Sequence, residues 1–149
     1  MLAAAATGAA VTVTGCTWFE PEPPPPPPDP LEPLLAGTRG LAGRYDRTLL
    51  VHPDLAGRLE PLRATHLAHV AAVLEAIGRP GPATPAPDGS PPDPGGIPAD
   101  DGEAVEQLRE HERDASEQAR QACLEAPPDR VALLGSICAA RASHVEALS

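Results

Sequence analysis

Proline divides this chain into segments that can and cannot contribute to a hydrophobic core. The 149 residues include 21 prolines, most of which cluster in two tracts, 20–33 and 79–100. Because proline lacks a backbone N–H and fixes φ, neither tract is expected to form an α-helix or a sheet. About 90 to 100 residues then remain to fold, which is enough for one small domain.

The remaining segments have the composition of helices. Trp, Tyr and Phe occur once each, and Trp18 and Phe19 lie outside the periodic region. The core must therefore consist of Leu, Val, Ile and Ala. Alanine favours helix, and the alternating β-branched runs that favour strands are almost lacking. The sequence thus predicts an all-α fold.

The clearest helix signal is the stretch PLRATHLAHVAAVLEAIG at 61–78. Its apolar residues recur every three or four positions, and His66 and His69 fill the gap in this apolar stripe. Pro61 should either kink the helix or mark its start. Similar periodicity predicts four helices in all, over 34–51, 54–77, 101–125 and 129–148.

These four helices form two hairpins, and a Pro/Gly-rich linker at 79–100 joins them. The linker is long enough to cross the full height of a bundle, so that the second and third helices can run parallel. Two hairpins joined by one long crossover are the plan of a ferritin-like four-helix bundle. We predict this all-α bundle for 34–149.

The N-terminal segment has the features of a bacterial lipoprotein signal. Residues 1–15 are apolar and small, and Val13-Thr14-Gly15-Cys16 resembles the lipobox, which is an aliphatic residue and two small residues before a cysteine. By this resemblance Cys16 would be lipidated and would become the mature N-terminus. No basic residue precedes the apolar run, so either the true start lies upstream or the segment is an apolar tail with an incidental cysteine.

A proline-rich stalk at 16–33 follows the lipobox and contains six consecutive prolines at 23–28. Such a run forms polyproline II helix, and the stalk could hold a domain roughly 40 Å from a membrane. We therefore expect an extracytoplasmic protein that is anchored to the outer face of the plasma membrane. A polyproline ligand for a binding domain is the alternative for this tract.

Two further stretches carry a resemblance to a known family. They are RLEPLRATHLAHVAAVLEAIG at 58–78 and APPDRVALLGSICAARASHVEAL at 126–148. Together they resemble the small ferritin-like lipoproteins of actinobacteria, over about 34–148. The resemblance implies a four-helix fold and a location in the cell envelope, and it implies no particular activity.

Polar residues interrupt the apolar stripes of the last three predicted helices near the middle of each helix. They are His66 and His69, then Glu112, then Arg141 and His144. A ferritin-like di-iron site needs Glu-x-x-His on two helices, but Arg63 and Arg141 occupy both glutamate positions here. Arginine is permanently charged and offers no lone pair to a metal. An iron oxidase or iron-storage protein is therefore not expected.

Two interpretations of these polar residues remain open. In the first, His66, His69, Glu112 and His144 hold a single transition-metal ion such as zinc or copper. In the second, Glu112 pairs with Arg141 and the histidines form hydrogen bonds, so that the polar residues fix the register of the helices. The first helix offers only Tyr45 or Asp46, and neither is expected at the height of the other residues.

Cys123 and Cys138 flank the turn between the last two predicted helices. A disulfide is plausible in an oxidising compartment. If the turn is centred near Pro128, however, the two cysteines are offset by roughly 9 Å along the helices, whereas a disulfide needs Cα atoms within about 7 Å. A bridge and two buried free thiols both remain open.

The sequence favours a non-catalytic protein. It contains no nucleophile elbow and no Gly-rich phosphate loop. Its net charge of −10 disfavours nucleic acid, which requires a basic face. We expect a lipid-anchored binding or structural module without a cofactor, with a membrane, an envelope protein or a second copy of the chain as partner. A small metal-binding or redox protein is the alternative.

Overall fold

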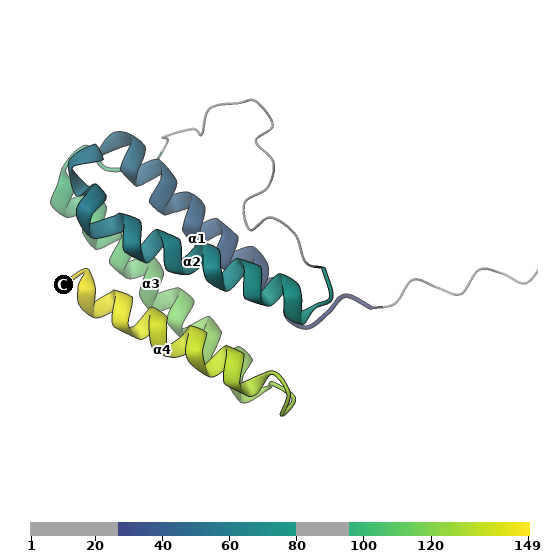
Figure 1. Ribbon diagram of the computed structural model, residues 1–149. Coiled ribbons are helices and arrows are strands. Elements are labelled where there is room, and N and C mark those ends of the chain that lie inside the picture. The colour runs from purple at the N-terminus through teal and green to yellow at the C-terminus, as the bar shows by residue number, and fades with distance from the viewer. Residues whose placement is uncertain (1–26, 80–95) are drawn as a thin grey trace, which may run out of the picture.

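The computed structural model describes residues 27–79 and 96–149, which form four α-helices (Figure 1). The helices are α1 (Glu32–Val51), α2 (Ala56–Ala76), α3 (Asp101–Leu124) and α4 (Val131–Ala147), and a short 3₁₀ turn, η1 (Pro53–Leu55), leads into α2. No strand occurs in these two segments, which confirms the all-α prediction for this part of the chain. Within the same segments, no helix combines the length and apolarity that a membrane crossing needs.

The four helices form a bundle of two antiparallel hairpins, α1–α2 and α3–α4. Helix α1 packs against α2 and α3, and α4 packs against α3 and α2. The pairs α1/α4 and α2/α3 are therefore diagonal to one another. Helices α2 and α3 begin at the same end of the bundle and run in the same direction (Figure 1), as the long crossover in the sequence predicts.

Local contacts set the ends of the helices, and several of these ends differ from the predicted ones. Helix α1 begins two residues early because Leu31 is buried and its N–H bonds the side-chain Oδ1 of Asp29 at 2.9 Å. Pro61 lies inside α2 and does not mark its start. Gly78 follows α2 with φ +71°, a left-handed conformation that ends a helix. Asp100 caps α3 by accepting a bond from the N–H of Glu103 at 2.9 Å.

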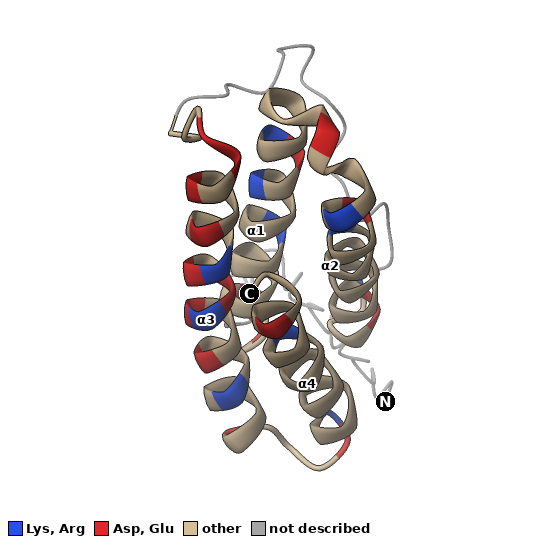
Figure 2. Ribbon diagram, turned by 90° about the vertical axis from the view of Figure 1, so that its left-hand side faces the viewer, with Lys and Arg blue, Asp and Glu red and all other residues tan. Residues whose placement is uncertain are grey.

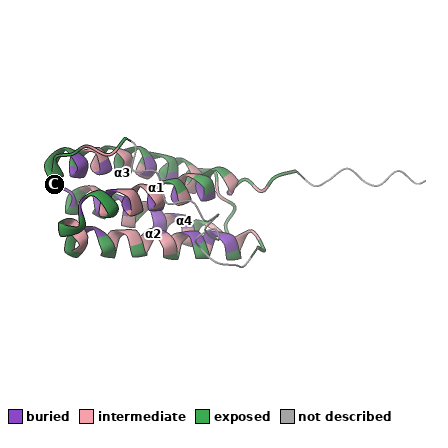
Figure 3. Cartoon of the chain, turned by 90° about the horizontal axis from the view of Figure 1, so that it is seen from above, coloured by how far each residue is buried: buried purple, intermediate pink, exposed green. Residues whose placement is uncertain are grey.

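Two apolar clusters fill the bundle, and the buried residues lie on the helix faces that point inward (Figure 3). The first cluster lies at the end where the chain enters α1, and it contains leucines 31, 34, 35, 74 and 134 with Val70, Val73, Ala119 and Ile137. The second lies toward the opposite end and contains Leu41, Tyr45, Leu59, Val105, Leu108, Ala115 and Leu148. The core is aliphatic as predicted, apart from Tyr45.

Charged residues lie mainly on the outside of the bundle. Figure 2 shows acidic and basic residues along the outer face of α3, where Arg109 and Arg113 pair with Glu106 and Arg120 pairs with Glu117. Such exposed pairs contribute little to stability. The exceptions to this outward distribution are Glu112 and Arg141, which are both fully buried.

Candidate metal centre

A layer of polar side chains separates the two apolar clusters. We define the central polar layer as Thr38, Tyr45, His66, Glu112, Arg141 and His144. Five of these residues are completely buried, and His144 is 6 % exposed. Charged and hydrogen-bonding groups are costly to bury unless they are paired, so the contacts within this layer decide what the layer can do.

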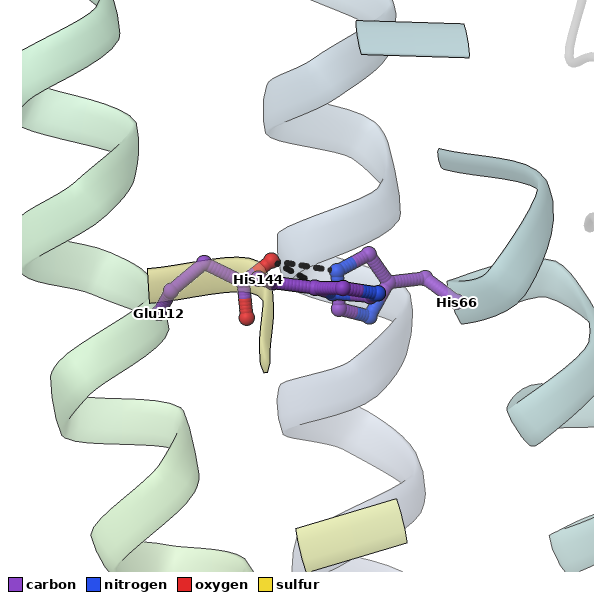
Figure 4. Close-up of side chains that lie close together, drawn as sticks. All are labelled: His66, Glu112 and His144. Carbon is purple, nitrogen blue, oxygen red and sulfur yellow. Dashed lines mark hydrogen bonds and ion pairs between the residues drawn. The ribbon is translucent and has the colours of Figure 1, made fainter. Parts of the chain in front are cut away.

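The carboxylate of Glu112 is the hub of the layer. Its Oε1 accepts a hydrogen bond from the Tyr45 hydroxyl at 2.6 Å. The same oxygen lies 2.6 Å from Nε2 of His66 and 3.1 Å from Nδ1 of His144. Figure 4 shows Glu112, His66 and His144 converging from α3, α2 and α4. Each of the four helices therefore supplies one side chain to this point.

Several polar atoms of the layer are left without a partner. Glu112 Oε2, His66 Nδ1 and Arg141 Nε are buried and have no hydrogen-bond partner within the described residues. Three groups thus crowd one carboxylate oxygen while the other oxygen contacts none. Buried polar groups are nearly always satisfied in folded proteins, so these three atoms are the groups of the layer that remain able to bond a further partner.

The surroundings keep Glu112 ionised. Burial alone would raise the pKa of its carboxyl group, but hydrogen bonds from His144, His66 and Tyr45 outweigh burial and lower this pKa to about 2. Burial, with Glu112 beside it, raises the pKa of the Tyr45 hydroxyl. At neutral pH the layer therefore holds one carboxylate and a protonated tyrosine.

Arg141 does not pair with Glu112, and the predicted Glu112–Arg141 ion pair is wrong. Its Nη1 donates to the carbonyl oxygen of Ala115 at 2.6 Å, and its Nη2 donates to the hydroxyl of Thr38 at 2.6 Å. No direct ion pair joins Arg141 and Glu112 in the described part of the chain. Two neutral oxygens, the Ala115 carbonyl and the Thr38 hydroxyl, hold the guanidinium instead.

Three of the four predicted metal ligands come together. One nitrogen from His66, one nitrogen from His144 and one oxygen from Glu112 all lie within 4.8 Å of one another. His69 is not part of this group. Its ring centre lies 6.2 Å from that of His66, and burial lowers its pKa to about 4, with further lowering by the nearby His66 and Arg141.

Tyr45 is the residue of the layer whose position was not predicted. Tyr45 lies six residues before the end of α1 and His66 lies ten residues after the start of α2, so that Tyr45 is four residues closer to the turn. This difference is about 6 Å at 1.5 Å per residue, which the long tyrosine side chain spans. Tyr45 lies on the same stripe of α1 as Thr38 and Leu41, and all three residues are buried. This position on the stripe was the sequence signal that Tyr45 points inward.

The other predicted site residues lie away from the layer or outside the described residues. Arg63 pairs with Asp46 at the side of the bundle. Cys123 and Cys138 are partly buried free thiols that pack against the first apolar cluster, so the disulfide is not formed and the free-thiol alternative holds. Cys16, the lipobox and most of the stalk fall outside the described residues.

A cavity of about 400 Å³ lies at the end of the bundle that the stalk enters, away from the polar layer. It is bounded by residues 30–34 and by the C-terminal turn of α3. Its walls carry no histidine or cysteine side chain, so this cavity contributes no metal-ligating group of these two kinds.

No known protein family, curated protein or solved structure matches this chain.

Proposed function

We propose that this protein binds a single transition-metal ion in the core of its bundle, through His66, Glu112 and His144. The observation that carries the proposal is the convergence of two imidazole nitrogens and one carboxylate oxygen, all buried, within 4.8 Å of one another. Imidazole and carboxylate ligands suit zinc, copper and iron. This proposal of a binding role without catalysis takes up the metal-binding alternative that the sequence left open, and not the module without a cofactor that the sequence favours.

The donor atoms fit one ion after small shifts of the side chains. Ligands that share a zinc ion at about 2.0 Å lie roughly 3.3 Å apart, so spacings shorter than this must widen and any longer spacing must close. Oε1 of Glu112 is already 2.6 Å from His66 Nε2 and 3.1 Å from His144 Nδ1. An ion bound between these atoms would take the place of the hydrogen bonds that converge on this one oxygen.

The bundle itself is proposed to be ferritin-like and to act outside the cytoplasm. Parallel α2 and α3 helices with one long connection support the ferritin-like plan, and the lipobox-like Val13–Cys16 sequence supports export and lipidation at Cys16. A metal-binding bundle on a stalk would then present its ion at the outer face of the plasma membrane, with an envelope protein as its partner.

A second candidate is that the polar layer only fixes the register of the helices. The bonds from Arg141 to Thr38 and to the carbonyl of Ala115 favour it, because they hold three helices at one height without a metal. The two functions require different properties of Glu112. A metal site requires its negative charge, whereas a structural layer requires mainly its hydrogen bonds.

Metal analysis of the full-length chain separates these candidates. The protein is incubated with zinc or copper, passed through a desalting column and assayed for bound metal, with Glu112→Gln and His66→Gln as test variants. Glu110→Gln and His111→Gln change the neighbouring exposed or partly exposed positions and are matched controls. The metal-site proposal predicts about one ion per chain in the wild type and both controls, and its loss in both test variants.

The same assay includes His69→Gln, which should keep the ion because His69 lies outside the ligand group. If the metal remains bound in Glu112→Gln, or if it is lost in His111→Gln, the core group does not hold the ion and the proposal is rejected. Circular dichroism of each variant, measured in parallel, distinguishes the loss of a ligand from the loss of the fold.

A further inference from the structure

We infer that Tyr45 is a fourth ligand of the proposed metal ion, so that the site takes one donor from each helix and prefers cupric or ferric ions. This inference rests on the metal site proposed above. It adds an oxygen donor from α1 to the nitrogen donors of α2 and α4 and to the carboxylate of α3.

The position of the Tyr45 hydroxyl supports this role. The hydroxyl lies 2.6 Å from Oε1 of Glu112, the same atom that His66 and His144 contact. The side chain is completely buried, and its ring centre lies 5.2 Å from that of His66. The hydroxyl oxygen therefore contacts the carboxylate oxygen on which both proposed imidazole ligands converge.

Four donors complete a coordination shell that three leave open. Structural metal sites with closed shells usually have four protein ligands, whereas three ligands leave a position for water. The layer is buried on all sides by the two apolar clusters. Tyr45 is the only other hydroxyl, imidazole or carboxylate group that contacts Glu112 within the described residues.

The charge balance of the layer also favours a second anionic ligand. Arg141 is a fully buried cation whose bonds go to neutral oxygens, and Glu112 supplies the single carboxylate of the group. A divalent ion would leave an excess of buried positive charge, which is costly. When the Tyr45 oxygen bonds to the ion, its O–H bond breaks and the proton leaves to solvent, and the phenolate then offsets one positive charge.

This ligand has a spectroscopic signature. A phenolate bound to Cu(II) or Fe(III) transfers charge to the metal and absorbs visible light, whereas a phenolate bound to Zn(II) does not. Full-length protein titrated with Cu(II) should therefore develop a visible band that saturates near one equivalent. Resonance Raman excitation into this band should show phenolate ring modes in the wild type, and this measurement needs no variant.

The matched variants are Tyr45→Phe and Cys138→Ser. Tyr45→Phe keeps the ring and should abolish the band, while copper still binds through the remaining three ligands. A thiolate bound to copper would also give colour, so Cys138→Ser is the control for this source. We expect this variant to keep the band. Stoichiometric copper with only the weak d–d absorption of any Cu(II) site, or an intense charge-transfer band that persists in Tyr45→Phe, would overturn the inference and leave the three-ligand site in place. Absence of any stoichiometric copper would reject the metal site and the Tyr45 role together.

Discussion

Arg141 on α4 donates a hydrogen bond to the hydroxyl of Thr38 on α1 at 2.6 Å, across the diagonal of the bundle. Both side chains are fully buried. The Thr38 hydroxyl in turn donates to the carbonyl oxygen of Leu34 at 2.6 Å, so its oxygen is free to accept from the guanidinium. This contact fixes the heights of two helices that do not pack directly against one another.

Replacing Thr38 by valine should destabilise the bundle. Valine has nearly the same shape but cannot accept a bond, so one buried N–H of Arg141 loses its partner. We expect the free energy of unfolding to fall by about 1–3 kcal/mol, measured by urea denaturation. Thr65→Val is the control, because the Thr65 hydroxyl bonds only the carbonyl of Pro61 within its own helix at 3.0 Å. An equal loss in both variants would show that the diagonal contact is unimportant.

His69 should make the stability of the metal-free protein depend on pH. Burial lowers the pKa of His69 from its ordinary 6.5 to about 4 in the fold, so the unfolded chain binds a proton at a pH where the folded chain does not. This contribution to stability is present above pH 6.5 and is lost as the pH falls toward 4. Urea unfolding with a chelator should show a decrease of at most about 3 kcal/mol across this range.

The variant His69→Gln should flatten this pH dependence between pH 6.5 and 4. A second decrease, from about pH 4.5 to pH 2, should remain in that variant, because it comes from Glu112, whose pKa the hydrogen bonds lower from 4.5 to about 2 against the effect of burial. If His69→Gln shows the same slope as the wild type above pH 4.5, the assignment to His69 is wrong.

Arg130 should hold the segment that leads into α1 against the bundle. Its two Nη atoms bond the two carboxylate oxygens of Asp29 at 2.7 and 2.8 Å, and the N–H groups of Leu31 and Glu32 bond Asp29 in turn. We expect Arg130→Gln to accelerate hydrogen exchange at the amides of Leu31 and Glu32. Arg79→Gln removes an exposed ion pair at the same end and should leave exchange at Leu31 unchanged. Unchanged exchange in Arg130→Gln would contradict this role.

His52 should fasten the end of the crossover to the α1–α2 turn. Its Nε2 lies 2.8 Å from the carbonyl oxygen of Pro98, and its Nδ1 lies 2.5 Å from a carboxylate oxygen of Asp101. Because His52 is buried, His52→Ala should lower the unfolding free energy by about 1–2 kcal/mol. His111→Ala, on the outer part of α3, should change it by less than about 0.5 kcal/mol. Equal effects would show that these two bonds are not important for stability.

Periodicity and proline placement were sufficient to predict the number, order and parallel arrangement of the helices. These features depend on where apolar residues recur, which the sequence contains directly. The end of α1 at residue 51 and the start of α3 at residue 101 were predicted correctly, and the other ends were wrong by one to two residues. Helix ends depend on local contacts, such as the bond from the Leu31 N–H to Asp29. Pro61 was harder to place, since a proline near the start of a long, well-packed helix does not end it.

The candidate site was predicted in part. The positions of His66, Glu112 and His144 follow from the breaks in the apolar stripes, and they do come together. The partner of Arg141 and the reach of Tyr45 did not follow, because both depend on side-chain length and on the exact turn geometry. Tyr45 and the two histidines contact one oxygen of Glu112, while Arg141 bonds two neutral oxygens. These choices of partner are visible only in three dimensions.

The most direct test of the metal site is an anomalous difference map from crystals of the full-length protein grown with zinc. We expect one strong peak in the core, bonded to nitrogens of His66 and His144 and to an oxygen of Glu112. Peaks confined to residues outside the polar layer, such as the partly exposed His111, with the core occupied by water, would contradict it. The polar layer would then be a structural element that fixes the register of the four helices.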